Sequence, residues 1–472
     1  MILACIPEKI NYIIFIRKEK CMNYRISLKT AALSLVWIFL MNAVFYGMHY
    51  LSILVPADLV KTRTREAFQS QNLVPENYPK LKYGLSSNYA LIGLDQFTDG
   101  LVIQMAMYRH PSKIRAAFLP KMAMPDVQDT TLLKNQFPCE TARFIATGQA
   151  AVSESKSYYY HRYWWGQKVV LLLMLTVFDY FQINNLLKAL IYFSFAVLGF
   201  LILLYDPKWF WPLFPILLSG ALFSGTIYYG GLTDSTTFLS SQLFLIAFLA
   251  FQHRMRDERR LAPLFTVLGC MAAFMYSMRG GLMLFCSVAF LVLYFITFGN
   301  RKPVDRYVGA FLCLTFFFAG FFGSFVIRQA VSALLLDWKS VLHDFLFQLK
   351  FRIGAGRSDF DKSIIPLFKR EFFNYVYATY NSRWLSDLLI GSGILAWTAA
   401  AGLFGFLAFR KREVKIAFDF AAVCFAVLIV FARIVIMRNH SYVHAWFIGR
   451  YMFLPLSFGW TALILAFKKW KG

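Results

Sequence analysis

Residues 418–467 read FDFAAVCFAVLIVFARIVIM, RNHSYVHAWFIGR and YMFLPLSFGWTALILAF in succession. The first and third parts are apolar, and each approaches the roughly 20 residues that a helix needs to cross a bilayer. The middle part, residues 438–450, places two histidines, an asparagine and two arginines at the joint between them. This pattern predicts two membrane-spanning helices whose connection holds ionisable groups at the membrane surface.

The whole chain repeats this apolar pattern. Of its 472 residues, 58% are hydrophobic and only 16% are charged, which predicts a polytopic membrane protein. A formal net charge of +24 would also suit a nucleic-acid-binding protein. Many of the basic residues, however, form short clusters between apolar runs, as the positive-inside rule produces, so no nucleic-acid partner is expected. The scattered cysteines lack metal-ligand spacing and are interpreted as small apolar fillers.

If about ten spans alternate from a cytoplasmic N-terminus, four basic clusters all fall on the cytoplasmic side, as the positive-inside rule requires. These clusters are HRMRDERR, GNRKPVDR, RKREVK and KKWKG. The segment 169–181 is too short to cross and is interpreted as an interfacial helix. Residues 1–21 are interpreted either as a basic cytoplasmic tail or as an upstream extension. The predicted spans are 30–55, 186–205, 210–227, 235–252, 262–278, 282–298, 307–326, 388–408, 416–437 and 446–467.

The predicted fold class is an all-α polytopic membrane protein with about ten transmembrane helices and a large outer first loop. The predicted division is a basic cytoplasmic N-terminus (1–29), a first transmembrane helix (30–55), an outer cap loop (56–166), transmembrane helices with the interfacial helix (167–327), a second outer loop (328–386) and C-terminal transmembrane helices (387–472).

The outer cap loop offers three candidate catalytic carboxylates, Asp58, Asp95 and Asp99. On a helix, Asp95 and Asp99 would share one face, because residues four apart are neighbours there. A carboxylate at the outer membrane surface can act as a general base on an acceptor hydroxyl. Asp99 is the first choice, because it opens an apolar stretch that could dock at the membrane. The alternative is that Asp99 only caps a helix.

The end of the same loop, residues 158–168, reads YYYHRYWWGQK. One interpretation is a platform on which sugar rings stack at Trp164 while His161 and Arg162 hold a phosphate. The other interpretation is an aromatic belt at the headgroup level, with the basic residues contacting anionic lipids.

Residues 351–362, FRIGAGRSDFDK, place Arg352 beside two glycines that allow a close backbone approach. Guanidinium groups there would suit phosphate binding, although no P-loop motif is present. The alternative is an exposed turn.

The joint between the last two spans contributes Asn439, His440, His444 and Arg450, and Arg279 in the MRGG turn could join the same patch. Ionisable groups at membrane depth are expensive, which favours a functional role. Together they suit a lipid phosphate that is bound and released. A His440/His444 metal pair lacks evident further ligands, so no metal site is assigned and a divalent cation stays open as a cofactor.

These outer-face groups resemble the arrangement in the type C glycosyltransferase superfamily. There, the first outer loop carries a catalytic Asp and the donor is a lipid-phosphate sugar. The stretch TDGLVIQMAMY, residues 98–108, is similar to the acidic signature of its arabinofuranosyltransferases, with Asp99 at the matching position and Thr98 in place of a first acid. YHRYWWG and NHSYVH are also similar to blocks associated with this superfamily.

This resemblance implies a bacterial inner-membrane enzyme whose active site faces the periplasm, most like a pilin arabinofuranosyltransferase. Its implied partners are a polyprenyl-phosphate arabinofuranose donor, membrane lipids, and a secreted pilin or a glycan as the acceptor. An O-antigen ligase or polymerase, and a lipid-linked sugar flippase or transporter, stay open as alternatives.

Overall fold

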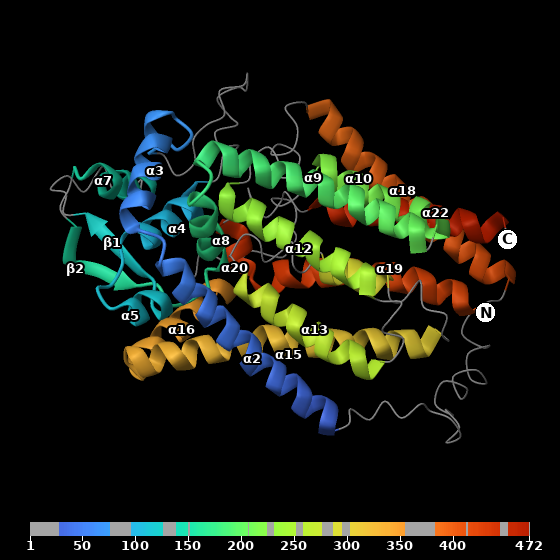
Figure 1. Ribbon diagram of the computed structural model, residues 1–472. Coiled ribbons are helices and arrows are strands. Elements are labelled where there is room, and N and C mark those ends of the chain that lie inside the picture. The colour runs from blue at the N-terminus through green and yellow to red at the C-terminus, as the bar shows by residue number, and fades with distance from the viewer. Residues whose placement is uncertain are drawn as a thin grey trace.

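The computed structural model describes residues 28–75, 96–125, 138–149, 152–205, 207–223, 231–251, 258–275, 287–294, 303–354, 383–411, 414–443 and 452–471. These residues form a bundle of long helices with a smaller cap of short elements at one end, and the C-terminus lies at the other end (Figure 1). The polar first loop and the apolar remainder of the sequence thus occupy separate parts of the molecule.

The bundle consists of helices that follow the apolar runs. Six of the described helices are long and apolar enough to cross a membrane. Helices α10 and α13 are shorter, and the span expected at 282–298 lies largely outside the described residues. The bundle helices are α2 (Leu28–Ile53), α9 (Tyr180–Tyr205), α10 (Phe210–Phe223), α12 (Leu232–Phe251), α13 (Glu258–Phe274), α15 (Pro303–Leu335), α18 (Arg383–Lys411), α19 (Val414–Ile436) and α22 (Phe453–Lys471), with a 3₁₀ turn η2 (Pro207–Trp209) before α10.

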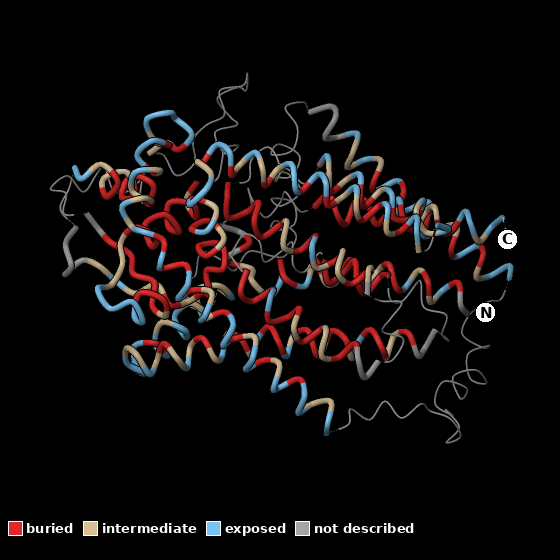
Figure 2. The backbone as a smooth tube through the Cα atoms, in the orientation of Figure 1, coloured by how far each residue is buried: buried red, intermediate tan, exposed pale blue. Residues whose placement is uncertain are grey.

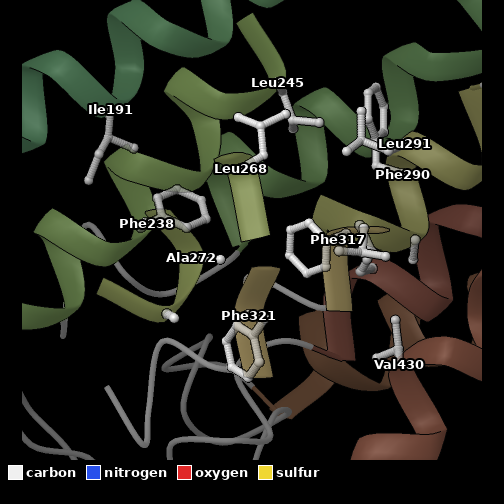
Figure 3. Close-up of a cluster of buried hydrophobic side chains, with 14 of the residues drawn as sticks. Ile191, Phe238, Leu245, Leu268, Ala272, Phe290, Leu291, Phe317, Phe321 and Val430 are labelled. Carbon is white, nitrogen blue, oxygen red and sulfur yellow. The ribbon is translucent and has the colours of Figure 1, made fainter. Parts of the chain in front are cut away.

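Helices α13 and α15 cross at two glycines. A Cβ atom on Gly269 would lie 2.0 Å from the carbonyl oxygen of Phe317, and one on Gly320 would lie 2.1 Å from that of Thr266. Small residues allow such close backbone contact between helices in a membrane, where apolar burial gives little driving force. The buried side chains of these helices meet those of α12 in the apolar core, while exposed positions recur along the outer faces of the long helices (Figures 2 and 3).

The cap contains α3 (Ala57–Gln69), α4 (Phe97–Met107), α5 (Lys113–Phe118), α7 (Cys139–Thr147) and a two-stranded antiparallel sheet. Strand β1 (Lys121–Pro125) pairs with β2 (Val152–Tyr159), with Lys121 opposite Tyr159 and a register shift after Met122. The predominantly helical structure agrees with the all-α expectation, and this small sheet is an exception to it. The two strands lie far apart in sequence and are short, so neither shows a long alternating pattern.

The region after α15 also differs from the expectation. The second outer loop was expected from residue 328, but α15 continues to Leu335 and α16 (Trp338–Ile353) follows almost at once. Asp337 caps α16, because its carboxylate accepts a 2.8 Å hydrogen bond from the backbone nitrogen of Ser340. Two further short helices, α8 (Gly166–Leu175) and α20 (Arg438–Val443), lie near the cap end of the bundle (Figure 1).

Candidate functional site

Three segments that lie far apart in the sequence meet at the cap end of the bundle. The segment after β2, helix α16 and helix α20 are joined by side-chain hydrogen bonds, and α16 packs against α20. The segments include parts of three motifs that the sequence analysis selected separately. We use the name outer cluster for His161, Arg162, Tyr163, Asp344, Arg352 and Asn439.

The centre of the outer cluster is an ion pair between the first and second segments. Arg162 donates two hydrogen bonds to the Asp344 carboxylate, 2.9 Å from Nε and 2.7 Å from Nη2. Burial is the largest single influence and works against the charged guanidinium, but the bonds to Asp344, together with the charge interactions with Tyr160, Asp344 and Tyr163, raise the pKa of Arg162. The guanidinium also lies 5.2 Å from the centre of the Tyr160 ring, which adds a cation–π contact. This pair fixes α16 against the end of the cap.

His161 shares the same carboxylate. Its Nε2 lies 3.7 Å from Oδ2 of Asp344, and its side chain is almost fully buried. Burial lowers the pKa of His161, and the negative charge of Asp344 opposes that effect. The Asp344 carboxylate lies close enough to stabilise a proton gained by His161, although no hydrogen bond joins the two groups in the described structure, and this makes His161 a candidate general base.

The third segment attaches through backbone and aromatic groups. Asn439 in α20 donates a 2.5 Å hydrogen bond from Nδ2 to the carbonyl oxygen of Phe351. Arg352 donates to the Tyr163 hydroxyl, and its guanidinium lies 5.5 Å from the centre of the Tyr163 ring. Helix α16 then ends at Gly354, whose φ of 81° is a conformation that glycine adopts readily. The outer cluster thus contains the ion pair of Arg162 with Asp344 and a second arginine, Arg352, that contacts the Tyr163 ring.

Asp99 does not belong to the outer cluster. It is only 2% exposed, and its carboxylate accepts three hydrogen bonds from the start of α12. These run from the backbone nitrogens of Leu232 and Thr233, at 2.8 and 2.9 Å, and from the Thr233 hydroxyl at 2.7 Å. Burial raises the pKa of Asp99, and the bonds from Thr233 and Leu232 oppose that rise.

Asp99 therefore caps a helix, although not its own. Asp99 lies inside the cap rather than at the membrane surface where a general base was expected, because α4 packs there with every residue from Thr98 to Met107 buried. The packing is close enough to require glycine next to Asp99, since a Cβ on Gly100 would lie 2.8 Å from Sγ of Cys139. The first-turn donors of α12 would otherwise lack partners inside the protein.

Of the other two candidate carboxylates, the structure describes only Asp58. Asp58 lies in the first turn of α3 with its side chain 92% exposed, and its carboxylate lies 3.3 Å from Nζ of Lys61. Such exposed pairs contribute little to stability. Asp95 lies outside the described residues, as do Arg279, His444 and Arg450, and the side chain of His440 is not described.

Trp164 is not exposed, so it does not offer the stacking platform of the first interpretation. The side chain has no exposed surface, its Nε1 donates a 3.1 Å hydrogen bond to the carbonyl oxygen of Ser324, and its ring packs against Phe45 and Tyr46. The aromatic block turns inward here because Trp165 adopts a φ of 60°, which is unusual for a residue other than glycine. The indole therefore packs between α2 and α15 and stabilises the contact between these helices.

Asp344 was missed in the sequence. It lies in WKSVLHDFLFQLKFR, where no motif or spacing separates it from an ordinary exposed residue on an amphipathic helix. Among the described residues, no group of three or more histidine, cysteine, aspartate or glutamate side chains could hold a metal ion.

No protein-family model, curated protein or solved structure matches this chain. The residues and the geometry of the chain itself are therefore the basis for any functional assignment.

Proposed function

We propose that the protein is an integral-membrane glycosyltransferase that moves a sugar from a polyprenyl-phosphate donor to an acceptor hydroxyl. Arabinofuranose is the first candidate for the sugar, and a pilin Ser or Thr or a glycan hydroxyl for the acceptor. The observation that carries the proposal is the outer cluster, where a base candidate and two arginines from separate segments meet at the cap end of an apolar helical bundle.

In this proposal, His161 and Asp344 act on the acceptor hydroxyl, and Arg352 acts on the donor phosphate. His161, beside Asp344, takes the proton of the acceptor hydroxyl as the acceptor oxygen bonds to the anomeric carbon of the sugar. The bond from that carbon to the phosphate oxygen breaks, and the phosphate keeps the electron pair. Arg352 balances the charge that develops on the leaving phosphate. We place the base at His161 rather than Asp99, because the three hydrogen bonds to Asp99 already serve α12.

The apolar bundle has room for part of a lipid tail. A cavity of about 220 Å³ lies between α12, α13 and α15 and is lined by Leu268, Ala272 and Phe317 among others (Figure 3). A prenyl chain is apolar and flexible enough to enter such a space. The cavity therefore supports a donor whose tail stays among the membrane helices.

The proposed topology has ten spans with both termini in the cytoplasm of a bacterial inner membrane, and the outer cluster then faces the periplasm. The positive-inside distribution of the basic clusters supports it. Reporter fusions after residues 110 and 360 should both read as exported. A cytoplasmic signal at both positions would place the outer cluster on the wrong side for a secreted acceptor.

An O-antigen ligase or polymerase is the second candidate, and one observation favours it. Such enzymes would use a late outer loop, and α16 from the second outer loop supplies both Asp344 and Arg352 to the outer cluster. The product separates the two candidates, because a transferase adds one sugar whereas a ligase or polymerase joins preassembled chains.

The test is transfer by detergent-purified protein from synthetic polyprenyl-phosphate arabinose to a pilin peptide or a glycan. Asp344→Asn should lower transfer strongly, whereas Asp58→Asn, which changes an exposed carboxylate in the same way, should leave it unchanged. Equal transfer by wild-type protein, Asp344→Asn and Asp58→Asn would remove the outer cluster from the chemistry. Absence of transfer to every acceptor, with chain joining instead, would favour the ligase.

A further inference from the structure

A second group of cations lies inside the protein, where the cap meets the ends of α2 and α15. It consists of Arg109, Lys168 and Arg328, and we call it the buried cation cluster. Arg328 has no exposed surface and Lys168 is 1% exposed, while Arg109 is half-buried. Each residue comes from a different element: Arg109 follows α4, Lys168 lies in the first turn of α8, and Arg328 lies in α15.

The acceptors that bond to these cations are mainly backbone carbonyls, and the Tyr46 hydroxyl also lies beside Arg328. Arg109 donates to the carbonyl oxygens of Ile53 at 2.7 Å and Val55 at 2.6 Å, where α2 ends. Arg328 donates from Nη1 to the carbonyl of Phe118, and its guanidinium lies 5.3 Å from the centre of the Trp164 ring. These bonds hold the two guanidinium groups in place.

Several donors stay unused. Nη2 of Arg109 and both Nε and Nη2 of Arg328 are buried and make no hydrogen bond of normal geometry to the residues that the structure describes. Within the described part of the chain, no acceptor bonds to Nζ of Lys168 and no carboxylate pairs with any of the three cations. In the outer cluster, by contrast, the positive charge of Arg162 is balanced by the Asp344 carboxylate.

Such an arrangement is costly when nothing else is bound. Buried charges without a counter-ion lose their hydration, and like charges repel more strongly where water is excluded. Burial, together with the charges of Arg109 and Arg328, lowers the pKa of Lys168 to about 7. The start of α8 adds the positive end of a helix dipole beside Lys168.

We infer that the buried cation cluster binds a phosphoryl group. A phosphate carries up to two negative charges and several acceptor oxygens, which match the unused N–H groups of two arginines and the Lys168 ammonium. A carboxylate supplies one charge and two oxygens and would leave donors unpaired. The position at the ends of α2 and α15 suits either the head of a phosphorylated lipid or a free phosphate. This site is distinct from the outer cluster, and phosphate binding there does not depend on glycosyl transfer.

The two sites are nevertheless close along the chain. Gln329, next to Arg328, donates a 3.5 Å hydrogen bond to the carbonyl oxygen of Arg162. Trp164 lies between Arg162 and Lys168 in the sequence and contacts Arg328. Occupancy of the buried cation cluster would therefore order the segment that holds His161 and Arg162.

The test measures the thermal midpoint of the detergent-purified protein in chloride, with and without inorganic phosphate at constant ionic strength. A parallel series uses nanodiscs of phosphatidylcholine with and without a polyprenyl monophosphate. The wild-type midpoint should rise in at least one series, because a ligand that binds only the folded state stabilises it. A rise with inorganic phosphate alone identifies a free anion as the ligand, and a rise with the lipid alone identifies a headgroup.

Lys168→Met provides a two-part signature. It should weaken the apparent phosphate affinity by about 10- to 100-fold, the worth of one charged hydrogen bond. It should also raise the midpoint in chloride, because it removes a buried charge that has no partner there. Lys188→Met is the matched control, since Lys188 is a half-buried lysine in α9 that is not part of the cluster. It should leave the response to phosphate unchanged.

Three results would overturn the inference. One is a wild-type thermal midpoint that does not change when either inorganic phosphate or the lipid is added at millimolar concentration. Another is an undiminished response in Lys168→Met, and the third is an equal loss in Lys188→Met. If Lys168→Met does not fold, Lys168→Gln and Arg109→Gln replace it, and the wild-type series still decides whether any phosphate binds.

Discussion

Asp99 and Asp344 are two partly or fully enclosed carboxylates at the same end of the molecule, and their surroundings differ in kind. Asp99 is buried and receives three neutral hydrogen bonds from the start of α12. Asp344 is partly exposed and receives two bonds from the Arg162 guanidinium, with His161 at 3.7 Å. The Asp99 carboxylate accepts hydrogen bonds from one helix end only, whereas the partly exposed Asp344 carboxylate lies between a guanidinium and an imidazole.

Because of this difference, we expect changes at Asp99 to affect mainly the stability of the protein and changes at Asp344 to affect mainly its activity. Removing a buried acceptor leaves several donors unsatisfied, so Asp99 should matter to folding. A partly exposed carboxylate in an ion pair contributes less to stability, because water already screens it. Asp344 can therefore be changed with a smaller loss of stability, which makes its effect on activity easier to measure.

The largest expected effect is on transfer by Asp344→Asn. The neutral amide cannot stabilise a protonated His161, so transfer should fall by about 10²- to 10⁴-fold, the usual worth of general base catalysis. The measurement is glycosylated acceptor per unit of enzyme, with Asp58→Asn as the control. Near-normal transfer by Asp344→Asn would mean that Asp344, like Asp99, has no part in the transfer reaction.

The next effect is on stability through Asp99→Ala. Loss of three hydrogen bonds at the start of α12 should lower the free energy of unfolding by about 3 kcal/mol. Denaturation of the purified protein, followed by helical circular dichroism, measures it. Asp99→Asn should cost less, because the amide oxygen still accepts from the helix. If Asp99→Asn instead folds normally and loses transfer by about 10²-fold or more, Asp99 is the base after all.

Lys168, a cation rather than a carboxylate, should make the stability of the protein depend on pH. The pKa of Lys168 is about 7 in the fold and 10.5 without the fold, so the unfolded state binds more protons between those values. Stability in phosphate-free buffer should therefore rise with pH above about 7, by up to about 1.4 kcal/mol per pH unit from this one group. Arg109, Arg328 and His49 are the charged or titratable groups that act on Lys168 or feel its charge.

Lys168→Met should remove that part of the slope, which thermal midpoints between pH 7 and pH 9 would show. Lys113→Met, which removes an exposed lysine at the start of α5, serves as the control and should keep the wild-type slope. Identical slopes in wild-type protein and Lys168→Met would mean that Lys168 is not held neutral by its surroundings.

The smallest effect is expected for Arg352→Lys. Lysine keeps the charge but loses the planar contact with Tyr163 and the paired N–H groups, so donor affinity should fall by about three- to ten-fold. Equilibrium binding of a polyprenyl-phosphate sugar measures it. Lys350→Arg, an exposed change in the same last turn of α16, should not alter the affinity. A larger loss in Lys350→Arg would move the phosphate contact away from Arg352.

The sequence by itself determined the membrane character of the protein and the approximate positions of its helices. Apolar runs are local features, and the hydrocarbon core makes any segment of that length and composition helical, because its backbone groups must bond internally. Helices α2, α9, α12, α15, α18 and α19 accordingly begin and end within a few residues of the expected bounds, apart from the early start of α9 and the long end of α15. The aromatic block, Arg352 and Asn439 were also recognisable as polar groups in unusual places.

Only the tertiary structure decided which polar groups meet. Asp99 bonds to Leu232, 133 residues away, and Arg162 to Asp344, 182 residues away. No local pattern encodes such partners, because they depend on how α4, α12 and α16 pack. The same packing turned Trp164 inward, gathered Arg109, Lys168 and Arg328 with no carboxylate among the described residues to pair with them, and paired the short strands β1 and β2. Periodicity determines the elements of this protein, whereas close contacts between distant elements determine the surroundings of each charged group.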